Sequence, residues 1–330
     1  MSCNPRFRAA RAASLVAAVA GLLGGCASLT AIDAEDAFSE EPQAHLELTD
    51  VPYHPQEALQ CGPAALAEVL GWSGREVTPE ALESDLFIPA REGTLQAEML
   101  AQARARGRVA YRIPGTFDAL AEELRAGHPV LVLQNLGLGW VPVWHYAVVV
   151  GYDPQKDAFI LRSGERERHY SPLDRFRRTW SRSDRWAVVV VPPDRLPATA
   201  EPGTWLQAAL DLEETGHTDA ARAAYETGRT RWPASGGLHI ALVNLHYDQG
   251  DLAAAEHAGR RGLEQADSRR GVLRNNLAMI LLERGDCSEA EAVAPEATDA
   301  EGPFAEAIRN TRETIRERCT TGATGPAPGP

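Results

Sequence analysis

A Gly-x4-Ala pattern recurs three times in the last third of the sequence, at intervals of 34 and 35 residues. The three pairs are Gly216 and Ala221, Gly250 and Ala255, and Gly285 and Ala290. Small residues at such positions let paired helices approach closely, while large residues fill the space between them. Each unit buries its apolar face only against its neighbours, and three copies suffice for one short all-α solenoid.

These units resemble tetratricopeptide repeats, whose period is 34 residues. In the first copy, the residues at that family's packing positions are Trp205, Ala208, Leu212, Gly216, Ala221, Tyr225 and Pro233. The resemblance implies a tetratricopeptide-repeat solenoid over residues 204–319, with 303–318 as its capping helix and a groove that recruits a protein partner. The Gly-Pro-rich tail, 320–330, is predicted to be disordered.

The sequence before the repeats has a different pattern. Two continuous apolar runs, Pro129–Leu133 and Trp186–Val191, are typical of buried strands. Prolines then interrupt the pattern in residues 193–203, which marks a linker to the repeats. With 330 residues, 44% of them hydrophobic, the chain is long enough for two cores.

Cys61 lies where a helix is predicted to begin. Pro63 suits the first turn of a helix, and the alanine-rich run Ala64–Leu70 continues it as far as Gly71. Free backbone N–H groups and the helix dipole stabilise a thiolate at such a position, and a neighbouring imidazolium lowers the thiol pKa further. The sequence therefore predicts a thiol nucleophile.

A histidine and two glutamines supply the groups that this nucleophile needs. His145 lies at the start of the β-branched run WHYAVVVGYD, a predicted strand, where its imidazole can act as the base. Upstream of Cys61, the side-chain amides of Gln56 and Gln60 are both positioned to donate to the oxyanion that forms when a thiolate attacks a carbonyl.

These residues resemble the bacteriocin-processing, double-glycine-type cysteine peptidases, a branch of the papain-like superfamily. The resemblance covers roughly residues 50–192 and rests on Pro52 and Gln56, the Cys-Gly-Pro helix start at Cys61, the strand at 129–133 and the His145 strand. It implies an α+β papain-like cysteine peptidase domain acting on a protein or peptide. It also implies that Gln56, rather than Gln60, is the oxyanion donor.

The third catalytic residue of that family is an Asp or Asn, usually in an Asp-Pro pair on the strand after the histidine, and this pair is missing here. A hairpin in which Tyr152 opposes Ala158 predicts His145 opposite Glu165, with Ser163 on the same face. Ser163 or Glu165 then orients the imidazole, or a Cys-His dyad acts without a third residue. Ser163 is our choice.

Two further groups of side chains near His145 have alternative interpretations. Trp140 and Trp144 either line a substrate groove or pack within a loop. Eight arginines crowd residues 162–185 with only four acidic residues among them. They form either a receptor for an acidic substrate or partner, or a solvated, ion-paired face.

The start of the chain has the pattern of a bacterial secretory signal. Three arginines precede the apolar stretch Ala12–Leu23, which is followed by Gly24, Gly25 and Cys26. This end resembles a lipobox, which implies a signal peptide over 1–25, cleavage before Cys26 and acylation of its thiol. An uncleaved anchor and an ordinary secretory cut after Gly25 are the alternatives.

The lipobox resemblance implies a membrane lipoprotein facing the periplasm. Ala27, rather than Asp, follows Cys26 and favours the outer membrane. The next residues, 26–49, are acidic and contain no Lys or Arg, so they are predicted to form a solvated tether between the lipid and the catalytic domain. Ordered packing against that domain is the alternative.

Two more cysteines are expected in the mature chain. Cys287 lies at the predicted start of the last repeat helix, and Cys319 at the end of the capping helix. Since an oxidising periplasm permits disulfides, we predict that the two are joined; two separate thiols are the alternative.

Composition excludes several other classes of function. A net charge of −13 argues against a nucleic-acid partner, and a single lysine, Lys156, makes Schiff-base chemistry improbable. The sequence has no CxxC pair, HExxH motif or phosphate-binding glycine loop, so neither a metal nor a nucleotide cofactor is indicated.

Two functions fit these observations. The first is a membrane-anchored, periplasm-facing cysteine peptidase whose repeats recruit proteins. The second is a binding scaffold at the cell envelope, in which the papain-like domain is catalytically weak.

Overall fold

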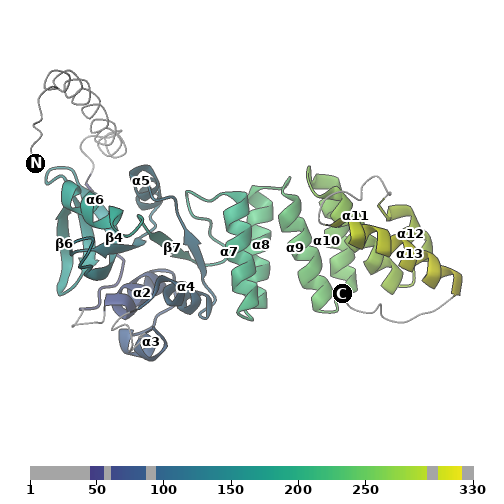
Figure 1. Ribbon diagram of the computed structural model, residues 1–330, viewed down its shortest axis with the longest axis horizontal. Coiled ribbons are helices and arrows are strands. Elements are labelled where there is room, and N and C mark those ends of the chain that lie inside the picture. The colour runs from purple at the N-terminus through teal and green to yellow at the C-terminus, as the bar shows by residue number, and fades with distance from the viewer. Residues whose placement is uncertain (1–44, 56–60, 87–93, 296–303, 322–330) are drawn as a thin grey trace, which may run out of the picture.

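A sheet with helices on both faces makes up the first part of the protein, and a row of paired helices makes up the second (Figure 1). The computed structural model describes residues 45–55, 61–86, 94–295 and 304–321. The predicted signal peptide, Cys26, Gln56 and Gln60 lie outside these residues. The prediction of an α+β domain followed by C-terminal helices is confirmed.

The sheet has seven strands, and all of its pairs are antiparallel. They are β1 (Leu46–Glu47), β2 (Val109–Arg112), β3 (Val130–Asn135), β4 (Trp144–Asp153), β5 (Ala158–Ser163), β6 (Arg166–Pro172) and β7 (Ala187–Val191). The order is β2-β7-β3-β4-β5-β6, and β1 pairs with the far end of β4. The two runs predicted as buried strands are β3 and β7.

Helices cover both faces of the sheet. On one face are α2 (Cys61–Trp72), α3 (Pro79–Leu86) and α4 (Gln96–Arg104), and on the other are α5 (Phe117–Arg125) and α6 (Leu173–Ser181) (Figure 1). Because neighbouring strand residues point to opposite faces, β4 contributes to both cores. Val148 and Val150 pack with α2, whereas Ala147 and Val149 pack with α5 and α6.

The pairing of β4 with β5 differs from the prediction near the turn. Tyr152 opposes Phe159 rather than Ala158. A bulge between Val149 and Gly151 takes up the extra residue, so that Val148 opposes Arg162, as the predicted register requires. The predicted register was therefore wrong by one residue at the turn and right at Val148, where the described pairing of the two strands ends.

The predicted tether, 26–49, extends too far. Leu46 and Glu47 are paired with β4, and Leu48 donates its backbone N–H to the carbonyl oxygen of Val150. Glycine at position 151 makes this possible, since a Cβ there would lie 2.1 Å from the carbonyl oxygen of Leu46. The order of residues 45–49 therefore comes from main-chain pairing, which the acidic composition did not reveal.

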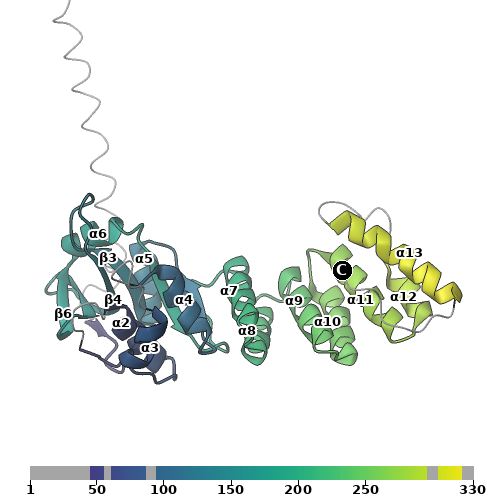
Figure 2. The same cartoon turned by 60° about the horizontal axis from the view of Figure 1, so that its bottom comes forward.

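The second part of the chain contains three helix pairs and a final helix. They are α7 (Pro202–Glu214) with α8 (Thr218–Arg231), α9 (Gly236–Asp248) with α10 (Leu252–Gln265), α11 (Arg270–Glu283) with α12 (Cys287–Val293), and α13 (Ala305–Thr321). Each pair packs on the next along the chain, and α13 lies against α11 and α12 (Figure 2).

The alanines and glycines of the repeated pattern have separate roles. Ala221, Ala255 and Ala290 are fully buried between helices, as expected. The three glycines, however, lie in the turn of each pair at φ of 81°, 74° and 84°, and a Cβ added to any of them would have no neighbour within 4 Å. Backbone conformation, rather than close helix approach, therefore explains the glycines.

The predicted linker, 193–203, is packed against the sheet domain. The buried Glu123 carboxylate accepts hydrogen bonds from the backbone N–H groups of Ala198 (3.0 Å) and Thr199 (2.8 Å), and from the Thr199 hydroxyl (2.6 Å). Next to it, Trp205 and Tyr111 lie in one hydrophobic core that includes β2, α7 and α8. The sheet and the first helix pair therefore share a core.

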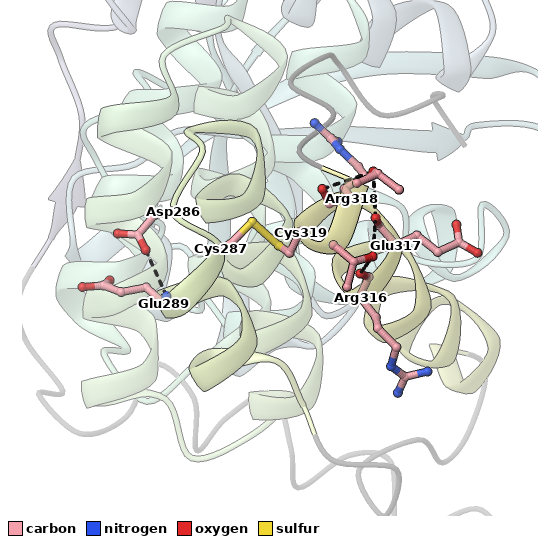
Figure 3. The surroundings of a disulfide bond; sticks show 9 residues. Asp286, Cys287, Glu289, Arg316, Glu317, Arg318 and Cys319 are labelled. Atoms are coloured by element: carbon pink, nitrogen blue, oxygen red, sulfur yellow. Dashed lines mark hydrogen bonds between the residues drawn. A yellow bond between two sulfur atoms is a disulfide. The ribbon is translucent and has the colours of Figure 1, made fainter.

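A disulfide closes the C-terminal end of the helical row. It joins Cys287, the first residue of α12, to Cys319 in the last turn of α13, with a Cα–Cα distance of 5.7 Å (Figure 3). Both residues pack against a small core that contains Leu281 and Ile315. In the described parts of the chain, no helix has the length and apolarity that crossing a bilayer requires.

Candidate active site

Cys61 is the first residue of α2, and its thiol is partly buried against the core beneath that helix. The backbone N–H groups of Cys61, Gly62 and Tyr146 lie close enough to the sulfur to favour a thiolate. Gly62 has no room for a side chain, because an added Cβ would lie 2.6 Å from Oγ1 of Thr94. The Cys-Gly-Pro sequence thus begins the helix, and its glycine lets Thr94 pack closely against the helix start.

Burial raises the pKa of the Cys61 thiol above its ordinary value. The three N–H groups oppose this effect without cancelling it. The expectation of a lowered thiol pKa is therefore wrong for the free protein, because desolvation of the thiolate exceeds the stabilisation at the helix start.

His145, the second residue of β4, forms a hydrogen bond with a serine side chain. Its Nε2 lies 2.8 Å from the hydroxyl oxygen of Ser163 at the end of β5. Burial, together with the charge of His169, lowers the pKa of His145 to about 4. The imidazole is consequently neutral at pH 7, like the Cys61 thiol, and the resting site contains no ion pair.

The thiol and the imidazole reach the same end of β4 from opposite faces of the sheet. His145 pairs across the sheet with Gln134, whose side-chain amide donates to Thr179 of α6 at 2.7 Å. Cys61 instead packs with Tyr146 on the α2 face. Within the described residues, no hydrogen bond joins the Cys61 sulfur to the imidazole. The predicted nucleophile and base are thus brought to adjacent residues of one strand, but not into direct contact.

Of the predicted orienting residues, Ser163 is the one bonded to His145. Glu165 lies in the turn between β5 and β6 and is exposed. Asp153, at the far end of β4, accepts hydrogen bonds from the backbone N–H groups of Gln155 and Lys156 within the turn. The third position of the site is therefore occupied by a neutral hydroxyl group.

A cavity of about 430 Å3 opens beside His145 on the α6 face. Polar and charged side chains line most of it, namely Gln134, His145, Ser163, Glu165, Arg166, His169, Ser171, Arg175 and Thr179. Sequence analysis noted the crowded arginines but missed Gln134 and His169. Pairing β3 with β4 in the sequence would have found Gln134, since it lies directly opposite His145.

An apolar hairpin between β3 and β4 borders this cavity. Trp140 is 81% exposed and Trp144 is 52% exposed, so neither packs in the interior. The hairpin is nevertheless ordered, because the side-chain oxygen of Asn135 accepts the backbone N–H groups of Gly137 (3.0 Å) and Val143 (2.9 Å). Their exposure argues against packing within the loop, which was one of the two interpretations of these tryptophans.

Glu68, two turns along α2 from Cys61, is a second ionisable group that sequence analysis missed. It is fully buried, and burial raises its pKa to about 8. Its Oε1 accepts the backbone N–H of His54 at 3.1 Å, two residues before the position of Gln56. An acidic residue in an otherwise apolar, alanine-rich helix was the available signal.

No group of three or more His, Cys, Asp or Glu side chains in the described segments has the arrangement of a metal site. The functional groups at this end of the sheet include the Cys61 thiol, the His145 imidazole, the Ser163 and Thr179 hydroxyl groups and the two arginines Arg166 and Arg175.

Comparison with known proteins identifies the sheet domain. Residues 48–188 match the Peptidase_C39 like family. The sheet domain is therefore similar to the C39-like peptidases over this segment. A search of curated proteins finds no match. Among solved structures, a crystal structure described as a C39-like peptidase from Bacillus anthracis is 17% identical, with 45% of this chain and 98% of that chain covered and a TM-score of 0.39.

Proposed function

We propose that the C39-like domain is a cysteine peptidase with Cys61 as nucleophile and His145 as base. One observation carries the proposal: in the segment that matches the family, a cysteine at a helix start and a hydrogen-bonded histidine converge on the first residues of β4. This is the pairing on which thiol peptidases depend.

The reaction begins when His145 accepts the thiol proton and the Cys61 sulfur attacks the peptide carbonyl. Since Nε2 of His145 is committed to Ser163, Nδ1 is the nitrogen available to the thiol. The backbone N–H of Cys61 and the amide of Gln56 stabilise the oxyanion. His145 then protonates the leaving amine, and water releases the acyl group from the sulfur.

Both groups are neutral in the free protein, so substrate binding must promote the proton transfer. Burial opposes the charged forms of Cys61 and His145 alike. Contact between the thiol and the imidazole would favour the ion pair, because each charge then stabilises the other. The site is thus proposed to rest in an inactive protonation state.

We further propose that the protein is a lipoprotein of the bacterial outer membrane, anchored through Cys26 and facing the periplasm. The lipobox-like sequence supports the anchor, and a disulfide between Cys287 and Cys319 is compatible with an oxidising compartment. Residues 204–319 are proposed to be tetratricopeptide repeats that bind a protein partner.

A catalytically weak binding scaffold is the second candidate. Two observations favour it: a serine occupies the place of the family's Asp or Asn, and no hydrogen bond links the Cys61 sulfur to His145 in the described structure. In that case the repeats and the exposed hairpin would carry the function.

Labelling with a vinyl-sulfone probe separates the two candidates. Under peptidase chemistry, Cys61→Ser abolishes labelling and His145→Ala slows it by about tenfold or more, whereas His257→Ala, a change at an exposed histidine of α10, has no effect. Equal labelling of wild type and His145→Ala would contradict the assignment of the base. Comparing periplasmic N-termini between wild type and Cys61→Ala cells would then identify the substrate.

A further inference from the structure

The cavity beside His145 carries two arginines that have no acidic partner. Arg166 lies at the start of β6 and Arg175 on α6. Neither forms an ion pair within the described parts of the chain. Their neighbours differ: Arg168 donates from Nε and Nη2 to the Glu47 carboxylate, at 2.6 Å each, and Arg177 is paired with Asp174.

The other groups in the cavity do not neutralise these two charges. Glu165 is the one carboxylate in its lining; it is exposed, as are Arg166 and Arg175, and no ion pair joins it to either arginine in the described structure. The floor is formed by Gln134 and Thr179, which are 3% and 6% exposed and hydrogen-bonded to each other. Two guanidinium groups above a buried, neutral floor are suited to a carboxylate, which can accept two parallel hydrogen bonds from an arginine.

The positive charge of the cavity extends to the histidines. After burial, the charges of Arg166 and Arg175 are the causes that lower the pKa of His169, and the charge of His169 in turn helps to lower the pKa of His145. Each of these shifts has the sign expected when cations are close to one another without a compensating anion.

We propose that this cavity binds a carboxylate of the substrate on the leaving-group side of the scissile bond. The carboxylate belongs either to an Asp or Glu side chain or to the C-terminus of a short peptide. The side of the bond follows from the site: His145 lines the cavity and protonates the leaving amine, whereas Cys61, which retains the acyl part, packs on the α2 face. This inference rests on the proposed peptidase function.

A bound carboxylate would also change the protonation of the site. Between Arg166 and Arg175 it offsets their charge, so protonation of His145 becomes more favourable. The substrate therefore promotes the thiolate–imidazolium pair that the free protein lacks, and neutral peptides are turned over slowly.

Cleavage of a peptide library by wild type, Arg166→Gln/Arg175→Gln and the control Arg178→Gln tests the proposal. Arg178 is an exposed residue of α6 that does not line the cavity.

Wild type and the control should prefer Asp, Glu or a free C-terminus just after the cleaved bond. In the double variant, kcat/KM for these peptides should fall by about tenfold or more, while that for Asn and Gln analogues should stay within about twofold. Amidated peptides separate side-chain from C-terminal carboxylates. Equal cleavage of acidic and neutral peptides by wild type would overturn the proposal.

A binding measurement keeps the test independent of catalysis. In Cys61→Ala, acetyl-Gly-Asp-amide and acetyl-Gly-Asp with a free C-terminus should shift the NMR signals of the His145 and His169 rings, whereas acetyl-Gly-Asn-amide should not. The double arginine variant should not respond. Ring shifts without any cleavage would refute the peptidase and retain the carboxylate site. Cleavage without an acidic preference and without ring shifts would refute the carboxylate site and retain the peptidase.

Discussion

Tryptophan side chains have opposite environments at the β2 edge of the sheet and at the hairpin before β4. Where β2 meets the helical row, Trp205 is fully buried, donates its ring N–H to the carbonyl oxygen of Ala224 and fills the space that Gly228 leaves open. On the hairpin before β4, Trp140 is 81% exposed. The backbone is ordered around both side chains, so the two tryptophans differ in burial and not in local order. Apolar area at the first end stabilises the fold, and at the second it is available to a ligand.

The boundary between the sheet and the first helix pair is a packed contact and not a free linker. The predicted linker fixes the first helix pair to the sheet through Glu123 and Thr199. The sheet domain and the first helix pair therefore form one packed unit, with α7 against the edge strand β2. The proposed active site lies at β4, which β7 and β3 separate from that edge.

The largest expected effect concerns the packed end. Trp205→Ala should lower the free energy of unfolding by about 3–5 kcal/mol, because it removes a fully buried indole and leaves a cavity. Denaturant unfolding followed by circular dichroism measures the loss. A cost below about 1 kcal/mol would mean that the core is not continuous across the boundary.

The buried carboxylate at the same end should give a smaller, pH-dependent effect. Glu123→Gln should cost about 2 kcal/mol at pH 7, since it disrupts the hydrogen bonds to His128, Thr199 and Ala198. Burial alone would raise the pKa of Glu123, but these hydrogen bonds outweigh it and leave the pKa below its ordinary value.

The sign of the pH dependence follows from that lowered pKa. A carboxyl group with a lower pKa in the folded state stabilises the protein above its unfolded pKa of about 4.3, and this contribution is lost as the pH falls through the folded value. Wild type should therefore approach Glu123→Gln in stability below about pH 4. Urea midpoints at pH 7 and pH 3.5 measure this, and a constant difference would contradict it.

At the open end, Ser163→Ala should lower kcat/KM by about tenfold, equivalent to about 1.4 kcal/mol, because His145 loses the group that orients it. Its unfolding free energy should change by less than about 0.5 kcal/mol. Ser163→Asp is the matched variant: a carboxylate beside the imidazole raises the pKa of His145 and should increase alkylation of Cys61 at pH 6. If both variants behave like wild type, Ser163 does not position the base.

The smallest effect on stability is expected at the exposed tryptophan. Trp140→Ser should change the unfolding free energy by less than about 0.5 kcal/mol, since the ring is already in water. Its KM for peptide substrates should rise several-fold if the hairpin contacts the substrate. A large loss of stability would remove the contrast with Trp205.

Sequence reasoning predicted the elements that periodicity and register control. The strand at His145, the helix at Cys61 and the proximity of Ser163 to His145 all follow from local patterns, and the bulge before Gly151 happens to restore the predicted register. The α+β domain and the C-terminal helices followed in the same way.

Tertiary burial accounts for what sequence reasoning missed. The thiol pKa depends on desolvation, which a helix-start argument does not include. The order of residues 45–49 depends on a partner strand far along the chain, and the cavity beside His145 depends on β3, β6 and α6 meeting in space. Each is a non-local property that no short motif encodes.

Strand β1 has a mechanical consequence. It is stitched to β4 at Gly151 and Tyr152, and β4 is the strand whose other end carries His145. A force on the chain ahead of Leu46 would therefore act along β4, and the main-chain hydrogen bonds and the Glu47–Arg168 contact would bear it in shear. If the amino-terminal end is held at a membrane, the force on the protein is borne by β4, the strand that carries His145.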